Sequence, residues 1–330
     1  MKNKCTSWSV VVVLAVVGCV STVESLGDSP VALPPPGKED SLMMAFGKWF
    51  AIGTAVPGSE LNQAERQLLF KNFGTITPEN CMKPAPVHPA EDRFDFAKAD
   101  ALVEMARANG LTVNGHTLVW HQQCPDWFFS DGGQIAGREL VLKRLRIHIA
   151  AVAGHFAGRM KSWDVVNEAI DGVGIQGHWQ IDRIPFKDIE DAIIAFHSEG
   201  MQVMITELDI DVVTRKTAGS EAGLRERDGA DPFANGLSDD LQQRLAVQYA
   251  KLFGLFLKHR DKITRVTFWG LHDGRSWLNY WPSKRTNHPL LWDRALQSKP
   301  ALSAVLAVTR EKTGQNAQPK PDGDGLKPAP

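Results

Sequence analysis

Between residues 40 and 313, short apolar runs alternate with longer amphipathic stretches, and this alternation predicts strands that are each followed by a helix. Seven apolar runs predict strands, at Lys48–Ala55, Gly74–Thr77, Leu111–His116, Met160–Asn167, Gly172–Gln176, Gln202–Thr206 and Ile263–Trp269. The amphipathic stretches predict helices at Leu61–Phe73, Phe94–Asn109, Arg138–Phe156, Pro185–Glu199, Ser238–Lys258 and Ala301–Glu311. Apolar strands that alternate with helices are typical of a parallel sheet.

Particular residues mark the ends of these helices. Gly110 and Gly200 each follow the last apolar position of a helix, where glycine commonly ends one. Pro185 is suited to the first turn of the next helix, because its fixed backbone angle is helical and it needs no N–H partner there. Ser238 can cap the helix that follows it by accepting a backbone hydrogen bond.

The two ends of the chain do not belong to this pattern. Residues 1–25 read as a signal peptide or lipoprotein leader, with Lys2 and Lys4 before the apolar Ser9–Val17. Cys19 could carry a lipid; the alternative is ordinary cleavage near Ser25. Both alternatives predict an exported protein, secreted or lipid-anchored at the cell envelope. Residues 26–39 form a Pro-rich linker, 40–313 one domain, and 314–330 a disordered Pro/Gly-rich tail.

Composition narrows the function classes. The 330 residues include 37 basic and 38 acidic side chains, which disfavours a nucleic-acid or membrane-surface binder held by bulk charge. Tryptophan is abundant, with 10 residues against 2 tyrosines, and flat indole faces suit sugar rings. Outside the leader, Cys81 and Cys124 remain; export permits a disulfide, but we favour two free thiols.

Polar residues at the strand ends favour a closed (β/α)8 barrel over an open doubly wound sheet. Glu79, His116, Glu168, His178, Glu207 and Asp273 each lie at or just beyond the carboxyl end of a predicted strand. In a barrel these ends converge on one face, where active sites are built. A Gly-rich phosphate loop, which would favour the open sheet, does not follow the first strand.

Glu168 and Glu207 are the candidate catalytic pair. Two carboxyl groups that face one another across a small gap are what glycoside hydrolysis requires. One must stay protonated to deliver a proton to the leaving oxygen, and the other must be ionised to attack the anomeric carbon. Two rim carboxylates in salt bridges are the alternative interpretation, but the polar neighbours of both residues favour catalysis.

These neighbours suggest roles of their own. Asn167 could bind a sugar hydroxyl, and Asp209 lies on the same side of its strand as Glu207. A chain from Glu207 through His178 to Asp209 could keep Glu207 ionised and oriented. The histidines His116, His121 and His178 could in principle bind a metal. However, no Cys/His cluster has zinc spacing, and the nearby Trp and Asn residues suit sugar better.

Six blocks of this chain resemble the endo-β-1,4-xylanases of glycoside hydrolase family 10, in that family's order. They are TPENCMKP (77–84), NGHTLVWHQQCPDWF (114–128), WDVVNEAI (163–170), GVGIQGHW (172–179), ITELDI (205–210) and WGLHDGRSWL (269–278). The resemblance implies a TIM barrel and retaining hydrolysis of xylan by a monomer without metal or cofactor. Glu168 would be the general acid/base and Glu207 the nucleophile.

The resemblance also implies roles for the residues around this pair. Asn167 would hold the sugar 2-hydroxyl, and His178 and Asp209 would orient Glu207. Gln176 would support the site from its strand, and Trp269 and Trp277 would wall the sugars nearest the cleaved bond. The residues that match the family's glycone-side binding residues are Glu79, Asn80, Lys83, His116, Trp120 and Gln123.

The chain departs from the family between Glu168 and Gly172. The family places a helix–strand–helix unit there, between the fourth and sixth strands, but only Ala169, Ile170 and Asp171 intervene here. Parallel strands need a crossover of about a dozen residues or more. The barrel could therefore have a gap, or Gly172–Gln176 could lose its strand structure, or the gene product could be incomplete; we favour the last explanation.

Two other functions remain open from the sequence. A barrel that lacks one unit could be a catalytically impaired xylan-binding protein, which would keep its aromatic cleft. A related β-1,4-glucanase is the second alternative, although Lys83, His116, Trp120 and Gln123 favour xylose. Replacing Glu207 by Gln separates a catalyst from a binder, because only a catalyst would lose an activity.

Overall fold

A computed structural model describes residues 10–11, 13–14, 41–57, 61–120, 122–166, 173–213, 231–281 and 284–312. The predicted catalytic residue Glu168, its neighbour Asn167 and His121 lie outside the described residues. The linker, the tail and most of the leader also lie outside them. The structure therefore describes most of the predicted domain and one side of its predicted catalytic pair.

The centre of the molecule is a parallel sheet, and seven of its strands correspond to the seven predicted ones. In chain order these are β3 (Ala51–Val56), β4 (Thr75–Pro78), β5 (Thr112–Val119), β8 (Ser162–Val166), β9 (Val173–Ile175), β11 (Val203–Asp211) and β12 (Ile263–Phe268). They pair in the order β8-β5-β4-β3-β12-β11-β9, every pair parallel. Chain neighbours therefore lie side by side, as in a barrel whose first strand pairs with its last.

A buried contact shows that this sheet curls around an interior. Arg265 on β12 donates from Nη1 to Oγ of Ser162 on β8, at 3.1 Å. Three strands separate β12 from β8 within the sheet. Because the two side chains meet directly, the sheet must bend so that its distant strands face one another. The fold is thus an incomplete (β/α)8 barrel, as predicted.

The sheet is interrupted between β8 and β9, where the sequence lacks a βα unit. These two strands do not pair with each other; β8 pairs with β1 (Val10–Val11), and β9 pairs with β2 (Val13–Leu14). Residues of the predicted leader thus lie where another barrel strand would lie. The sequence left open whether the barrel has a gap or whether Gly172–Gln176 loses its strand structure. Because this stretch keeps its parallel strand, β9, the structure has the barrel with a gap.

Helices follow the strands close to their predicted positions. The longer ones are α2 (Gln63–Asn72), α4 (Ala97–Ala108), α5 (Arg138–His155), α6 (Phe186–Ser198), α7 (Asp239–Lys258) and α8 (Pro300–Lys312). Ser238 caps α7 by accepting from the Leu241 N–H, and Gly110 and Gly200 follow α4 and α6 with φ of 72° and 79°. Sequence analysis did not predict the short helices α1 (Leu42–Phe46) and α3 (Pro84–Val87).

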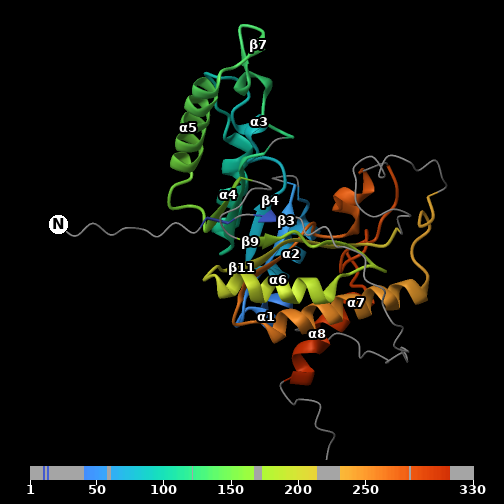
Figure 1. Ribbon diagram of the computed structural model, residues 1–330. Coiled ribbons are helices and arrows are strands. Elements are labelled where there is room, and N and C mark those ends of the chain that lie inside the picture. Colours follow the sequence, from blue (N-terminus) through green and yellow to red (C-terminus); the bar gives the residue numbers. More distant parts are fainter. Residues whose placement is uncertain are drawn as a thin grey trace, which may run out of the picture.

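The core lies between the sheet and these helices. On α7, Leu245, Tyr249, Leu252 and Phe256 are fully buried, at the spacing of one helix face. On α6, Ile189 and Ile193 are buried, while Phe186 and Phe196 near its two ends are partly buried against the same core. In Figure 1, α6, α7 and α8 lie along one side of the sheet. Each buried Leu, Ile or Phe contributes about 1.5–3 kcal/mol, so this interface carries much of the stability.

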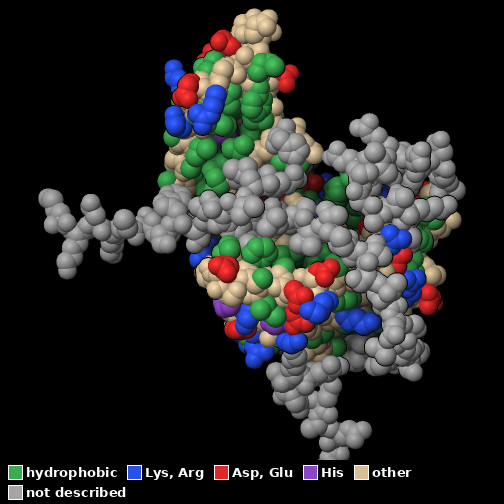
Figure 2. Space-filling view, viewed as in Figure 1, with side chains coloured by type: hydrophobic (Ala, Val, Ile, Leu, Met, Phe, Trp, Pro, Cys, Tyr) green, Lys and Arg blue, Asp and Glu red, His purple; other side chains and the backbone are tan. Residues whose placement is uncertain are grey.

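A separate lobe stands out from the body. It contains α3, α5, the single-turn helix η1 (Asp126–Phe128) and a hairpin of β6 (Ser130–Asp131) and β7 (Gln134–Ile135) (Figure 1). Hydrophobic side chains are visible on its surface in Figure 2, and Phe129, Ile135 and Ile147 are among the exposed ones.

Cys81 and Cys124 are both free thiols, as we expected.

Candidate active site

Glu207 lies within β11, all nine residues of which are buried. Its carboxylate accepts hydrogen bonds on both oxygens, from Gln176 Nε2 to Oε1 at 3.1 Å and from His178 Nε2 to Oε2 at 3.0 Å. Gln176 directly follows β9, and His178 begins the short strand β10 (His178–Gln180), which pairs with β11. Two neighbouring strands therefore fix the position of this carboxylate.

His178 connects Glu207 to a second carboxylate. Its Nδ1 lies 3.0 Å from Oδ1 of Asp209, and the other oxygen of Asp209 accepts from Trp277 Nε1 at 2.8 Å. Trp277 begins the single-turn helix η4 (Trp277–Asn279) after β12. The predicted chain Glu207–His178–Asp209 is present, and Trp277 extends it.

The charge of His178 follows from these two contacts. Burial disfavours the imidazolium, but the carboxylates of Asp209 and Glu207 outweigh burial and raise the pKa of His178 to about 10. His178 is therefore an imidazolium at neutral pH and donates from both ring nitrogens. As a cation, His178 donates charge-assisted hydrogen bonds to both Glu207 and Asp209.

A second group of predicted residues follows the carboxyl ends of β4 and β5. Lys83 donates to Oδ1 of Asn80 at 3.0 Å, and its ammonium lies 4.4 Å from the centre of the Trp120 ring. Burial lowers the pKa of Lys83, while the charges of Glu79 and Glu207 oppose this. Burial also raises the pKa of Glu79. The charge of Lys83 therefore interacts with the carboxylates of both Glu79 and Glu207.

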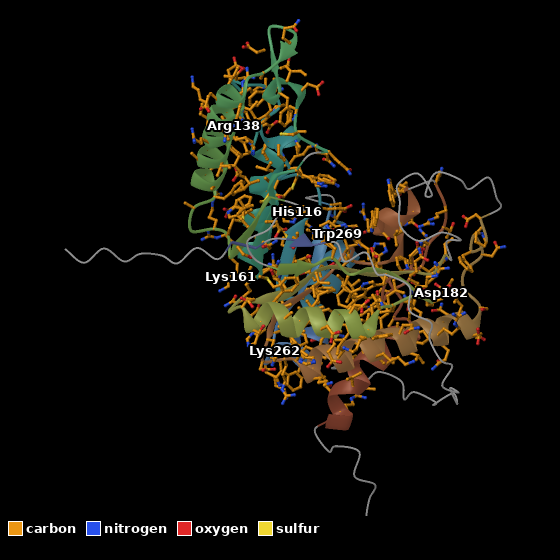
Figure 3. All side chains as sticks on the ribbon, in the orientation of Figure 1. His116, Arg138, Lys161, Asp182, Lys262 and Trp269 are labelled. Atoms are coloured by element: carbon orange, nitrogen blue, oxygen red, sulfur yellow. The ribbon has the colours of Figure 1, made fainter. Side chains whose placement is uncertain are left out.

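His116 and Trp269 lie between the two groups. The edge of one ring meets the face of the other at 5.2 Å between centroids, and Trp269 meets His178 in the same way at 6.3 Å. Figure 3 shows His116 and Trp269 close together near the middle of the molecule. Trp269 thus contacts both His116 and His178.

Asp164 is a site residue that sequence analysis missed. Its carboxylate accepts from Asn114 and lies 2.9 Å from Nδ1 of His116, and it is 2% exposed. The contact fixes the His116 ring, with Nδ1 toward Asp164 and Nε2 away from it. A signal was available, because Asp164 lies four positions before Glu168 and so faces the same side of an extended strand.

Asp273 does not join the site, contrary to the expectation for a strand-end carboxylate. It is fully buried, and its Oδ2 accepts from Lys299 at 2.9 Å while Oδ1 accepts from the Leu290 N–H at 2.8 Å. The chain turns into the single-turn helix η3 (Asp273–Arg275) at this position, so the side chain points into the core. The sequence pattern predicted that Asp273 follows the end of a strand, but it could not predict the direction in which the Asp273 side chain points.

Gln123 lies at the edge of the described site. Its backbone oxygen accepts from Ala85, so the loop after β5 contacts the start of α3.

Two further findings concern the described residues as a whole. They contain no group of three or more His, Cys, Asp or Glu residues placed to hold a metal ion. None of their helices is long and apolar enough to cross a bilayer.

Comparisons with known proteins agree with this fold. The family model of "Glycosyl hydrolase family 10" matches residues 41–171 and 169–308, in two segments that meet at the junction after Glu168. "Endo-1,4-beta-xylanase A" of Xylanibacter ruminicola is 31% identical over 353 residues, covering 84% of this chain and 95% of the relative. That alignment is longer than this 330-residue chain, so the relative has segments that this chain lacks.

Two further proteins give the same picture. "Endo-1,4-beta-xylanase B" of Paenibacillus barcinonensis is 31% identical over 336 residues, 81% of this chain and 97% of the relative. The structure titled "Thermobacillus composti GH10 xylanase" superimposes with a TM-score of 0.71 at 31% identity, covering 81% of this chain and 99% of that one.

A β/α barrel in which Gln176 and His178 hold the carboxylate of Glu207, with Trp269 and Trp277 against the His178 ring, is consistent with a glycoside hydrolase. The family match and these relatives make the assignment specific: the chain belongs to glycosyl hydrolase family 10.

Proposed function

We propose that this protein is an endo-acting, retaining hydrolase of the β-1,4-xylosidic bonds of xylan. The observation that carries the proposal is the arrangement of Glu207, whose two oxygens accept from Gln176 and from the His178 imidazolium. The names of the relatives, endo-1,4-β-xylanases, support the choice of substrate.

In this reaction Glu207 attacks the anomeric carbon and Glu168 protonates the leaving glycosidic oxygen. The bond from the sugar to the leaving chain breaks as the bond to Glu207 forms. Glu168, now ionised, takes a proton from water, whose oxygen displaces Glu207 and restores both carboxyl groups. Retention requires the two carboxyl groups to lie about 5–5.5 Å apart. His178 and Asp209 act through Glu207, which they orient.

The surrounding residues have binding roles in the proposal. Lys83, Asn80, Glu79, His116, Trp120 and Gln123 would hold the sugars on the non-reducing side. Trp269 and Trp277 would wall the sugars at the cleaved bond, and Asn167 would bind the 2-hydroxyl. The Lys83–Trp120 contact supports this assignment, because it places a hydrogen-bond donor over one face of an aromatic ring in this part of the chain.

We also propose that the protein acts outside the cytoplasm as a monomer, secreted or lipid-anchored at Cys19. The basic and apolar start of the chain supports export. No metal or cofactor takes part in the proposed steps, since acid, base and nucleophile are side chains.

The test is the release of reducing sugar from xylan by the purified protein, beside Glu207→Gln and Glu104→Gln. Glu104 lies on α4 with its carboxylate largely exposed, and serves as the matched control. We expect Glu207→Gln to lose hydrolysis and Glu104→Gln to keep it. Release by the Glu207→Gln variant at the parent rate would refute the role of Glu207.

Two further readouts test the finer parts of the proposal. Proton NMR of the first product should show the β-anomer, and the α-anomer would refute retention. A fall in xylan viscosity should precede most reducing-sugar release, since an endo-acting enzyme cuts inside the chain. Faster cleavage of β-1,4-glucan than of xylan would favour the glucanase alternative instead.

A further inference from the structure

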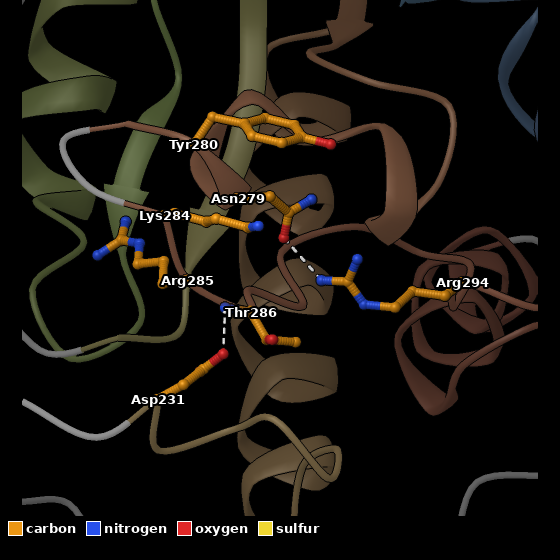
Figure 4. A pocket seen from close by; sticks show the side chains of 7 residues that line it. All are labelled: Asp231, Asn279, Tyr280, Lys284, Arg285, Thr286 and Arg294. Atoms are coloured by element: carbon orange, nitrogen blue, oxygen red, sulfur yellow. Dashed lines mark hydrogen bonds between the residues drawn. The ribbon is translucent and has the colours of Figure 1, made fainter.

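A cavity of about 410 Å³ lies between the segments that follow two neighbouring barrel strands, β11 and β12. Its lining comes from Asp231, in the segment between β11 and α7, and from the segment between β12 and α8, which contributes Tyr280, Lys284 and Arg294 among others (Figure 4). Both segments follow the carboxyl ends of barrel strands, and these ends form the active-site face of such barrels.

The described residues of the lining carry more positive than negative charge. Among them, Lys284, Arg285 and Arg294 line the cavity, together with the carboxylate of Asp231. Arg285 forms an ion pair with the buried Asp211 at 3.0 Å. Asp231 accepts from the Thr286 N–H at 2.8 Å and so stays at the wall. Lys284 and Arg294 are therefore the cations that remain to attract an anion.

Arg294 is held in place although it is exposed. Its Nη2 donates to Oδ1 of Asn279 at 2.6 Å and to the Asn287 oxygen at 2.9 Å. Asn279 is itself buried and donates to the backbone oxygens of Asp273 and Ser276. In Figure 4, Lys284 and Arg294 extend toward Asn279 from opposite sides. Arg294 on this fixed support, with the exposed Lys284 on the other side of Asn279, forms a site suited to one carboxylate.

The cavity is connected to the site by a pair of aromatic rings. Trp277, which donates to Asp209, stacks on Trp281 with 5.1 Å between ring centroids. Tyr280, 69% exposed, lies between them in the chain and lines the cavity. A sugar chain that leaves the Glu207 site along these two indoles passes the cavity, so a branch on that chain could enter it.

We propose that this cavity binds the carboxylate of a uronic acid branch and makes acidic, uronate-bearing xylan the preferred substrate. The inference rests on the proposed function, because the branch must be carried by a glycan bound at Glu207. Lys284 and Arg294 hold the carboxylate, and Tyr280 contacts the branch ring. A neutral branch would gain none of the charge-assisted hydrogen bonds.

Isothermal titration calorimetry on the full chain with Glu207→Gln, which prevents turnover, tests the proposal. The ligands are xylotriose and xylotriose that carries one glucuronic acid. We expect the acidic oligosaccharide to bind about 5- to 10-fold more tightly at low salt, as one charge-assisted contact allows. This advantage should shrink in salt, because Lys284 and Arg294 are exposed. Adding Lys284→Gln should remove most of it, and Lys284→Arg should preserve it.

Lys143→Gln, an exposed lysine on α5 outside the cavity lining, is the matched control and should leave the advantage unchanged. Equal affinities for the two oligosaccharides would overturn the inference and leave the proposed function standing. An advantage that survives Lys284→Gln combined with Arg294→Lys would also overturn it. If neither oligosaccharide binds, the proposed xylan site fails, and the inference fails with it.

Discussion

Replacing Asp209 by Asn tests how the fold sets the charge beside Glu207. Asparagine keeps the size of the side chain and can still accept from His178 Nδ1, so the change removes mainly a negative charge. Asp209 is fully buried, and its oxygens contact His178 at 3.0 Å and Trp277 at 2.8 Å. Its charge therefore acts on the imidazole with little screening by water.

The magnitude follows from the pKa of His178, which is about 10 against an ordinary 6.5. One pKa unit corresponds to about 1.36 kcal/mol, so the carboxylates, net of burial, favour the imidazolium by roughly 5 kcal/mol. Asp209 is the larger of the two contributions. Without it, burial works against the charge of Glu207 alone, and we expect the pKa of His178 to fall toward 6.5 in the Asp209→Asn variant.

The assay is a pH titration of the protein with ¹⁵N-labelled histidine, followed by NMR, with the His178 signal assigned through His178→Gln. The unchanged protein should keep both His178 nitrogens protonated through pH 9, whereas Asp209→Asn should lose one proton near neutral pH. We also expect kcat on xylan to fall about 10- to 100-fold, because the neutral ring orients Glu207 less firmly. Asp211→Asn, a buried carboxylate on the same strand, is the control and should leave this titration unchanged.

Thermal unfolding against pH gives a second check. The folded-state pKa of His178 lies above its ordinary value, so its contribution to stability is complete below about pH 6.5 and is lost as the pH rises toward 10. Asp209→Asn should therefore cost most stability at or below neutral pH. An unchanged His178 titration in Asp209→Asn, or an equal shift in Asp211→Asn, would refute the reasoning.

Three further predictions concern other parts of the molecule. Burial opposes the ionisation of Glu65, but its contacts with Arg275 and His272 outweigh burial and lower the pKa of Glu65 to about 2. Glu65→Gln should therefore lower the unfolding free energy by about 2–4 kcal/mol at pH 7. The stabilisation by Glu65 should vanish as the pH falls from about 4.5 to 2. Removing residues 1–25 should lower the melting temperature by only a few degrees, because β1 and β2 pair through two residues each. Asp164→Asn should raise KM on xylan several-fold with a smaller change in kcat, because it loosens His116.

Differential scanning calorimetry checks the first two predictions, and steady-state kinetics checks the third. Equal stability of Glu65→Gln and the parent at pH 7 would contradict the first. A protein without residues 1–25 that is unfolded would show that the N-terminal strand is essential to the barrel. A fall in kcat with KM unchanged in Asp164→Asn would mean that His116 acts in the chemical step rather than in binding.

The local sequence determined most of the fold. Periodicity gave the seven strands and the long helices within a few residues, because apolar spacing reports which face of an element is buried. Gly110, Gly200 and Ser238 act as predicted because their effects are local to the backbone. The residues around Glu207 could be named in advance, because strand ends of a parallel barrel share one face.

Tertiary structure decided what depends on residues far apart in the chain. Sequence alone could not show that Asp273 turns toward Lys299 while Asp164 turns toward His116, since side-chain direction depends on where the backbone bends. It showed that a βα unit was missing, but not that β9 persists as a strand or that residues 10–14 pair beside it. Packing across the barrel decides these points, because the free edges of β8 and β9 leave backbone groups that must find partners.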